Sequence, residues 1–219
     1  MLKYLTNSKK GLRRDRNQDR VLIAEQPGYY LFLIFDGVSS HPRSYAFINQ
    51  YKKILRSKLS GVLSDGNNLE ELLFESHKEV LASGCYGMST VSGLFYSKIE
   101  GLAKFVNIGD SRVYIFSNQF IEKITSDDSM ENRPNILTKC LGSSELSLED
   151  FKLKEVNTDY NFLICTDGFY SLMSSNLKEY FSTYNFKKLK NIEKKLSYLQ
   201  RRKNNDDSSY ILIKHEIPS

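Results

Sequence analysis

The sequence predicts a single α+β domain with largely antiparallel sheets that spans residues 1–219. Strand-like and helix-like segments occur in blocks and not in strict alternation, which disfavours a doubly wound parallel fold. No repeat or linker divides the chain. In addition, 40% of its residues are apolar, which is enough to build a full core.

The N-terminal half begins with two strands and continues with two helices. Alternating or continuous apolar runs and apolar residues at helical spacing predict strands at 21–25 and 29–35 and helices at 45–59 and 69–83. The second strand is apolar almost throughout, which is typical of a strand buried on both faces. We expect Asn67 or Asn68 to cap the second helix and Gly84 to end it in the left-handed conformation.

The C-terminal half contains a β-rich block, a helical pair and a final strand. Short polar or glycine-containing breaks separate the first strands of this block, which predicts consecutive hairpins. The predicted strands lie at 90–98, 102–109, 112–117, 119–125, 151–157, 160–166 and 209–216, and the predicted helices at 174–182 and 187–202. In the last helix, Leu189, Ile192, Leu196 and Leu199 form one apolar stripe, so its many lysines are expected to face water.

Charge and cysteine usage exclude several classes of protein. The 31 Lys and Arg against 26 Asp and Glu leave a net charge of +5, and the basic residues crowd one helix face, so we expect no nucleic-acid partner. The chain has no run of about 18 apolar residues and no apolar leader, which predicts a cytoplasmic protein without a membrane partner. Cys85, Cys140 and Cys165 are widely spaced and odd in number, so we expect neither disulfides nor a thiolate zinc site.

The most informative feature is a set of aspartates at the ends of predicted strands. Asp36, Asp110 and Asp167 each neighbour a glycine, which lets backbone and carboxylate approach a common point. Asp206 precedes the final strand, and Asp19 precedes the first. A single Asp-Gly pair marks a turn more often than a site, but several such strand ends together indicate a cluster.

Clustered carboxylates usually hold hard divalent cations through oxygen ligands, and magnesium or manganese fits best. Zinc would recruit histidine or cysteine. Because His41, His77 and His215 show no ligand spacing, we treat them as structural or surface residues.

A run of arginines near Asp19 offers groups that can bind a substrate phosphate. Paired hard metals can activate a water for attack on phosphorus. Arg13, Arg14 and Arg16 offer guanidinium groups that match the geometry of phosphoryl oxygens. Together, the carboxylates and the arginines predict phosphoester hydrolysis.

Five segments carry the pattern of one enzyme family. They are GLRRDRNQD at 11–19, LFLIFDGVSSH at 31–41, FVNIGDSRVYIF at 105–116, FLICTDGFYSLM at 162–173 and NNDDSSYILI at 204–213. In this order they resemble motifs of the metal-dependent serine/threonine protein phosphatases of the type 2C (PPM) family, bacterial type. Each match is weak alone, but together they cover nearly the whole chain and are specific.

The resemblance implies a central antiparallel β-sandwich flanked by helical layers, and it assigns roles to individual residues. Asp36 would bridge two manganese or magnesium ions, and the Gly37 carbonyl would ligate one of them. The other implied roles are first-metal ligands for Asp167 and Asp206, direct or water-mediated metal contact for Asp19, a third, auxiliary metal for Asp110 and phosphate binding for Arg14. The implied reaction is attack of a hydroxide bridging the two metals on phosphoserine or phosphothreonine.

The chain departs from the family pattern at several places. Ser39-Ser40 replaces a glycine pair, and we interpret the serines as a cap for the following helix. Val38 cannot donate a proton, unlike the histidine of many eukaryotic relatives, and Met88 replaces a glycine. The segment between Ser129 and Asn135 is very short, which predicts a reduced or missing flap and puts the substrate range in question.

Three functions remain compatible with the sequence. The first is a protein phosphatase, expected to be a monomer, that acts on a phosphorylated protein and opposes a serine/threonine kinase. The second is a pseudophosphatase or regulatory binding module that retains the fold without efficient catalysis. The third is a metal-dependent phosphoesterase for small molecules, because the absence of a flap would leave the site less selective. Retention of all the expected metal ligands and of Arg14 favours the first.

Overall fold

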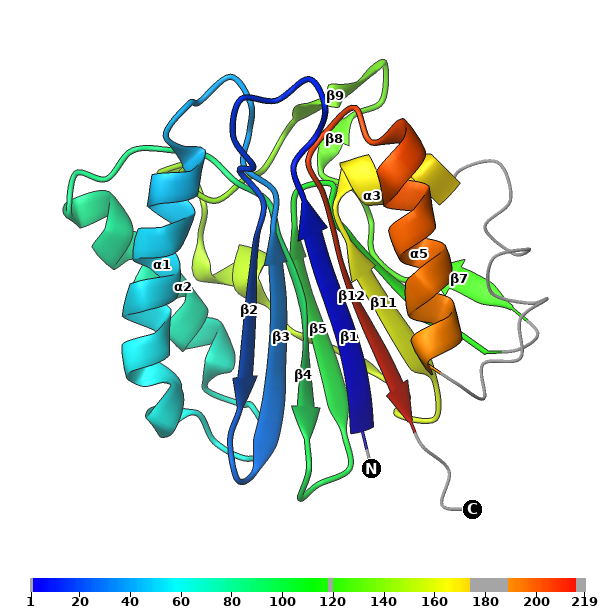
Figure 1. Cartoon of the computed structure of the whole chain (residues 1–219). Helices are drawn as coiled ribbons and strands as arrows, with labels where there is room; N and C mark the ends of the chain where they lie inside the picture. Colours follow the sequence, from blue (N-terminus) through cyan, green and yellow to red (C-terminus); the bar gives the residue numbers. More distant parts are fainter. Residues whose placement is uncertain (1, 118–119, 174–188, 216–219) are drawn as a thin grey trace.

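The protein forms a β-sandwich between two helical layers (Figure 1). The computed structural model describes residues 2–117, 120–173 and 189–215. Within them, two five-stranded antiparallel sheets pack face to face, and helices cover both outer faces. The fold class expected from the sequence is therefore confirmed.

The first sheet pairs the beginning of the chain with its end. Its strands are β1 (Leu2–Lys9), β6 (Arg112–Phe116), β7 (Ile121–Lys123), β11 (Asn161–Cys165) and β12 (Ser208–His215). They lie in the order β1-β12-β11-β6-β7. The sequence analysis missed β1, because this edge strand is polar at most positions and its apolar neighbours come from β12, far away in the sequence.

The second sheet contains two hairpins, at 20–35 and 91–108, but the predicted run of consecutive hairpins is wrong after residue 108, because the next strand, β6, lies in the first sheet. Its strands are β2 (Arg20–Glu25), β3 (Tyr29–Phe35), β4 (Val91–Ser97), β5 (Ala103–Ile108) and β10 (Lys154–Val156). Their order is β10-β5-β4-β3-β2, so β2 and β10 form its two edges.

Helices cover the outer faces of both sheets. They are α1 (Ser44–Lys58), α2 (Leu69–Ala82), α3 (Asp167–Met173), α5 (Leu189–Lys203) and the 3-10 turns η1 (Leu59–Gly61) and η2 (Leu148–Phe151). Figure 1 shows α1 and α2 on one flank and α3 and α5 on the other. Among the helices described, none is both long and apolar enough to cross a membrane.

The central strands are apolar throughout because they are buried on both faces. On β3, Phe32 and Ile34 face the other sheet, whereas Leu31, Leu33 and Phe35 face α1 and α2. Strand β12 repeats this alternation: Ile211 and Ile213 point between the sheets, and Tyr210 and Leu212 point toward α3 and α5. Three stacked apolar layers therefore hold the four structural layers together.

Two predicted helix caps are wrong. Helix α1 begins after Arg43 without a side-chain cap, so Ser39-Ser40 does not start it. The side chain of Asn68 accepts a hydrogen bond from the backbone N–H of Leu63, 2.9 Å away, and closes the preceding loop instead of capping α2.

Asn67 does not cap α2 either, because its Oδ1 accepts a hydrogen bond from Lys104 Nζ at 2.8 Å. The expectation for Gly84 is confirmed, since it follows the helix with a φ of +72°.

The strand predicted at 151–157 is also partly wrong. Ser147 and Asp150 form a capping box that turns residues 148–151 into η2, and this turn places Phe151 in the core under α2. Only Lys154–Val156 pairs with β5. The helix predicted at 174–182 lies outside the described residues, and α3, just before it, was not anticipated as a helix.

A short hairpin occupies the place of the expected flap. Strands β8 (Ser129–Met130) and β9 (Arg133–Leu137) pair with each other and with no other strand. The sequence predicted a reduced or missing flap here, and the structure has this small two-stranded element above the sandwich (Figure 1).

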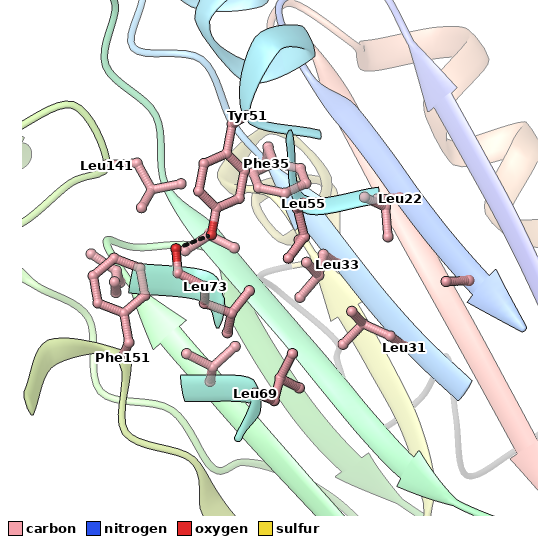
Figure 2. Packing of buried hydrophobic residues seen from close by; sticks show 14 of the residues in the cluster. Leu22, Leu31, Leu33, Phe35, Tyr51, Leu55, Leu69, Leu73, Leu141 and Phe151 are labelled. Carbon is pink, nitrogen blue, oxygen red and sulfur yellow. Dashed lines mark hydrogen bonds between the residues drawn. The ribbon is translucent and has the colours of Figure 1, made fainter. Parts of the chain in front are cut away.

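The core between the second sheet and its helices combines apolar packing with buried hydrogen bonds, one of which is drawn in Figure 2. Tyr51 of α1 donates its hydroxyl to the Leu73 carbonyl of α2 at 3.1 Å, and its ring lies 5.7 Å from that of Phe35. Both Tyr51 and Leu73 are buried. Tyr51 thus connects α1 both to α2, through the hydrogen bond, and to β3, through the ring contact.

At this contact we expect apolar packing to contribute more to the free energy of unfolding than the Tyr51 hydrogen bond does. Leu73→Ala should lower the free energy of unfolding by about 3 kcal/mol, because it leaves a cavity. Tyr51→Phe should cost about 1 kcal/mol, because it removes one neutral hydrogen bond and keeps the ring. Urea unfolding followed by circular dichroism measures both values, and a larger loss for Tyr51→Phe would contradict this order.

Candidate active site

One cavity of about 570 Å³ collects most of the residues singled out in the sequence. It lies where the loop before β2, the end of β3, the turn between β5 and β6 and the starts of α3 and β12 meet. Six of the seven candidate site residues line it: Arg14, Asp36, Gly37, Asp110, Asp167 and Asp206. The seventh, Asp19, lies buried close behind, within electrostatic range of Asp36 and Asp167.

Hydrogen bonds fix the backbone of Asp36 where β3 ends. Its N–H donates to Thr90 Oγ1 at 3.1 Å, and its carbonyl accepts from the Thr90 N–H at 2.9 Å and from Ser89 Oγ at 2.8 Å. Ser111 lies 2.7 Å from Thr90 Oγ1 and extends the network toward Asp110. The Asp36 backbone therefore cannot shift without breaking three contacts.

Only glycine fits at position 37. A Cβ there would lie 2.7 Å from the Cβ of Gln18 and 3.0 Å from the Cβ of Ser44. The loop that carries Arg14 and Asp19 thus packs directly against the residue after Asp36.

Asp19 is held by two hydroxyl groups and keeps one oxygen free. Its Oδ2 accepts hydrogen bonds from Ser209 Oγ at 2.7 Å and Thr166 Oγ1 at 3.1 Å. Its Oδ1 is buried and has no hydrogen-bond partner among the described residues. An unpartnered buried carboxylate oxygen is costly, and a bound cation would satisfy it.

The carboxyl groups make one another hard to ionise. Burial, together with the negative charges of Asp19, Asp167 and Asp110, raises the pKa of Asp36 well above its usual value. Burial and its acidic neighbours also raise the pKa of Asp19, to about 8, and of Asp110, to about 7. The cluster is therefore more stable when protons or bound cations reduce its negative charge.

Asp110 reaches the cavity from a tight turn between β5 and β6. Gly109 has a φ of +102°, and a Cβ there would lie 2.6 Å from the Cγ2 of Thr90, so this position requires glycine. The Gly109 N–H donates to the Asp128 carboxylate at 3.0 Å, which fixes the turn from its other side.

Arg14 grips Asp206 with two parallel hydrogen bonds. Its Nε and Nη2 donate to the two carboxylate oxygens of Asp206, each at 2.6 Å. The expected phosphate-binding cation and one expected metal ligand are thus partners in this arrangement. Both line the cavity, so the pair is accessible to a ligand.

The donor set fits magnesium or manganese, although its present arrangement is not that of a metal centre. Among the residues that the structure describes, no three His, Cys, Asp or Glu side chains converge closely enough to hold an ion. The oxygens are nevertheless of the type that these cations prefer, and the free Asp19 oxygen and the mutually repelling carboxyl groups fit a cationic partner. The chemistry of the site therefore matches divalent metals.

The sequence analysis missed the role of Asp207. This buried side chain accepts the N–H of Gly11 at 2.9 Å and that of Gln18 at 2.8 Å, and so fastens both ends of the arginine-bearing loop to β12. The Asp-Asp doublet at 206–207 was the available signal, because adjacent residues at the start of a strand point in opposite directions.

His41 was expected to be structural or at the surface, but it lines the cavity beside Ser39 and Ser40. The Oγ of Ser40 lies 3.2 Å from its Nδ1. The opposite wall comes from the short hairpin, through Asn135, Ile136 and Leu137, and from Cys140.

His77 is structural, as expected. It is buried under η2, and its Nε2 accepts the backbone N–H of Gly142 at 3.0 Å. This contact ties the chain after the hairpin to α2. All three cysteines are free, and Cys140 and Cys165 are buried, in line with the absence of disulfides predicted from the sequence.

Comparison with known proteins places this arrangement among solved structures. No family model and no curated protein sequence matches the chain. Among solved structures, it is similar to an S. agalactiae serine/threonine phosphatase, with a TM-score of 0.83 at 18% identity over 99% of this chain and 100% of that one. It is also similar to the serine/threonine phosphatase Stp1 from Staphylococcus aureus, with a TM-score of 0.78 at 21% identity over 99% and 96% of the two chains.

A third similar structure is that of RsbX in complex with magnesium. Its TM-score is 0.71 at 14% identity, and the match covers 97% of this chain and 94% of that one. These three likenesses cover 97–99% of this chain. The chain therefore has the fold of the bacterial type 2C serine/threonine phosphatases, as its motifs indicated.

Proposed function

We propose that the chain is a single catalytic domain that hydrolyses phosphoserine and phosphothreonine in proteins with the help of divalent metals. One observation carries the proposal: carboxylates from separate strand ends converge with Arg14 on one cavity in a phosphatase fold. Carboxylates alone would suit many cations. An arginine that faces the same space adds a group that recognises phosphate.

Each candidate residue has a role that its position supports. Two manganese or magnesium ions would be held by the carboxylates of Asp36, Asp167 and Asp206 and by the Gly37 carbonyl. The free Oδ1 of Asp19 would contact these ions. Asp110 would hold an auxiliary third ion. Such ions lower the pKa of a water and neutralise charge on the phosphoryl group. The protein contributes a fixed backbone, because the bonds from Thr90 and Ser89 keep Asp36 in place.

Arg14 would bind the phosphoryl oxygens of the substrate. The two hydrogen bonds that it now makes to Asp206 are those that a guanidinium makes to phosphate. Asp206 would then be free to turn to a metal. Substrate binding and metal binding are therefore coupled through this one pair.

A second function, a binding module without efficient catalysis, is favoured by one specific observation. Arg14 occupies both carboxylate oxygens of Asp206, and Ser39 and Ser40 line the cavity where the family pattern has glycines. If this closed pair persists in the presence of metal, the fold would still recognise a phosphoprotein but would turn it over poorly.

We expect metal-dependent hydrolysis of a phosphothreonine peptide. Activity should appear with manganese, disappear with a chelator and fall by at least about 1,000-fold in Asp36→Ala, because that carboxylate lies at the centre of the cluster. Phosphate release measures the rate, and circular dichroism checks that the variant is folded. A folded, metal-bound wild type without activity would favour the binding module. Preference for a nucleotide or sugar phosphate over all phosphopeptides would contradict the protein substrate.

Arg14→Ala should mainly raise the Michaelis constant, because it removes a phosphate contact and leaves the metal ligands in place. We expect an increase of about tenfold or more for the phosphopeptide. Arg14→Lys keeps the charge but loses the fork geometry, so it should recover only part of the loss. An unchanged Michaelis constant with a lower turnover number would argue against phosphate binding by Arg14.

The metal-free protein should lose stability as the pH rises. The pKa of Asp19 is raised to about 8 and that of Asp110 to about 7, so the folded state holds protons that the unfolded chain releases near pH 4. This stabilisation is complete below about pH 4 and is lost by about pH 8. Urea unfolding in chelator should therefore give a lower unfolding free energy at pH 8.5 than at pH 5.5.

Two controls accompany this measurement. Asp19→Asn should reduce the pH dependence, because it removes one titrating group. Manganese should restore stability at pH 8.5, because a cation replaces the lost protons. Stability of the chelated protein that does not change between the two pH values would contradict the carboxylate cluster.

A further inference from the structure

Helix α1 carries a row of polar and basic residues along one face. Tyr45, Asn49, Lys52 and Arg56 follow one another at spacings of four, three and four residues, which aligns them on a helix. The opposite face holds the buried Phe47, Ile48, Tyr51 and Leu55. The row spans about 16 Å along the helix axis.

Two arginines from outside the helix extend this row. The guanidinium of Arg16 stacks over the Tyr45 ring at 4.2 Å, and that of Arg20 lies 5.9 Å from the same ring. Arg20 also donates to the side chain of Asn49 at 3.1 Å. We call Arg16, Arg20, Lys52 and Arg56 the α1 cationic strip.

The strip has no carboxylate partner. Among the described residues, none of its four cations forms an ion pair, although other lysines and Arg14 and Arg112 do. Helix α1 has no acidic residue in its first turn. Burial and the positive charges of Arg56 and Arg20 lower the pKa of Lys52. Lys52 therefore lies close enough to Arg20 and Arg56 for their charges to repel.

The strip starts a few residues along the chain from residues that line the cavity. Arg16 is two residues beyond Arg14, which lines the cavity. Tyr45, in the first turn of α1, is four residues beyond His41, the last residue of the cavity-lining segment 37–41. The neighbouring Ser44 donates its hydroxyl to the Val38 carbonyl, at 3.2 Å, and so joins the start of α1 to that wall. The strip then leads away from the cavity along the flank that carries α1 (Figure 1).

We propose that the α1 cationic strip binds acidic residues of the phosphoprotein substrate while its phosphorylated residue occupies the cavity. The proposal rests on the proposed phosphatase function and adds to it a preference for substrates with acidic residues near the phosphorylated residue. An extended peptide advances about 3.3 Å per residue, so 16 Å corresponds to about five residues. The preferred substrates therefore carry Asp or Glu within about three to seven residues of the phosphorylated residue, on one side of it.

A protein segment fits the strip better than a nucleic acid does. Binding of single strands requires exposed aromatic rings on which bases stack. The one aromatic ring of the row, Tyr45, is already covered by Arg16. The continuity of the strip with a cavity suited to a phosphorylated side chain also points to the substrate protein itself.

The test compares two phosphothreonine peptides that differ only in charge. One carries three glutamates four to six residues from the phosphothreonine, with N-terminal and C-terminal versions, and the other carries glutamines there. With manganese at low salt, one acidic version should have a kcat/KM at least about fivefold higher than its neutral partner. Salt at about 0.5 M should remove the difference.

The double variant Lys52→Glu plus Arg56→Glu should abolish this preference and leave kcat/KM for the neutral peptide unchanged. Neither side chain lines the cavity, and the variant relieves repulsion, so folding should be retained. Lys154→Glu is the control, because it reverses one lysine charge on β10, at the opposite edge of the sheet from β2. This control should keep the wild-type preference.

A binding measurement tests the strip independently of catalysis. Anisotropy of a labelled, unphosphorylated acidic peptide should show binding to wild type and to Lys154→Glu, and at least about fivefold weaker binding to the double variant. This result without any hydrolysis would support the strip and refute the phosphatase. Equal kcat/KM for acidic and neutral peptides, a preference that survives charge reversal, or equal competition by single-stranded DNA would overturn the proposal.

Discussion

Repulsion among carboxylates at one end of the sandwich is the constraint on which the site depends. Asp36, Asp110 and Asp167 face one cavity with Asp19 behind it. The charges of Asp19, Asp110 and Asp167 raise the pKa of Asp36, and Asp167 also raises the pKa values of Asp19 and Asp110. A flexible chain would move these groups apart. They stay together because each begins or ends a strand whose two faces are buried in apolar layers. The packing of the sandwich therefore works against the electrostatics of its own active end, and a divalent cation would relieve that conflict.

Two adjacent residues just before β12 have different roles in this cluster. Asp206 lines the cavity, whereas its neighbour Asp207 turns inward and accepts two backbone N–H groups of the arginine-bearing loop. Chemically identical side chains thus serve as a ligand candidate and as a structural clamp, because successive residues point to opposite sides. The clamp matters for function, since it positions the loop that carries both Arg14 and Asp19.

The sequence could predict those elements whose residue pattern does not depend on partners far away in the chain. The doubly buried β3 reads as an unbroken apolar run, and Asp-Gly and Gly-Asp pairs mark three of the strand ends that meet at the cavity. Edge strand β1 was missed because its pairing partner lies about 200 residues away and its own pattern is polar. The predicted Asn caps failed because both side chains have other partners: Asn67 binds Lys104, which only the tertiary fold brings near, and Asn68 binds Leu63 in the preceding loop.

Opposite charges in neighbouring regions explain how such a site could choose a substrate. The cavity is rich in carboxylates and needs bound cations before it can accept a phosphate dianion. The α1 cationic strip begins a few residues from that cavity and keeps its charge whether or not metal is bound, because its cations pair with no described carboxylate. An acidic segment would therefore be attracted first by the strip and then retained by Arg14 and the metals. Selection on flanking charge would suit a protein in which a short hairpin stands in place of the expected flap.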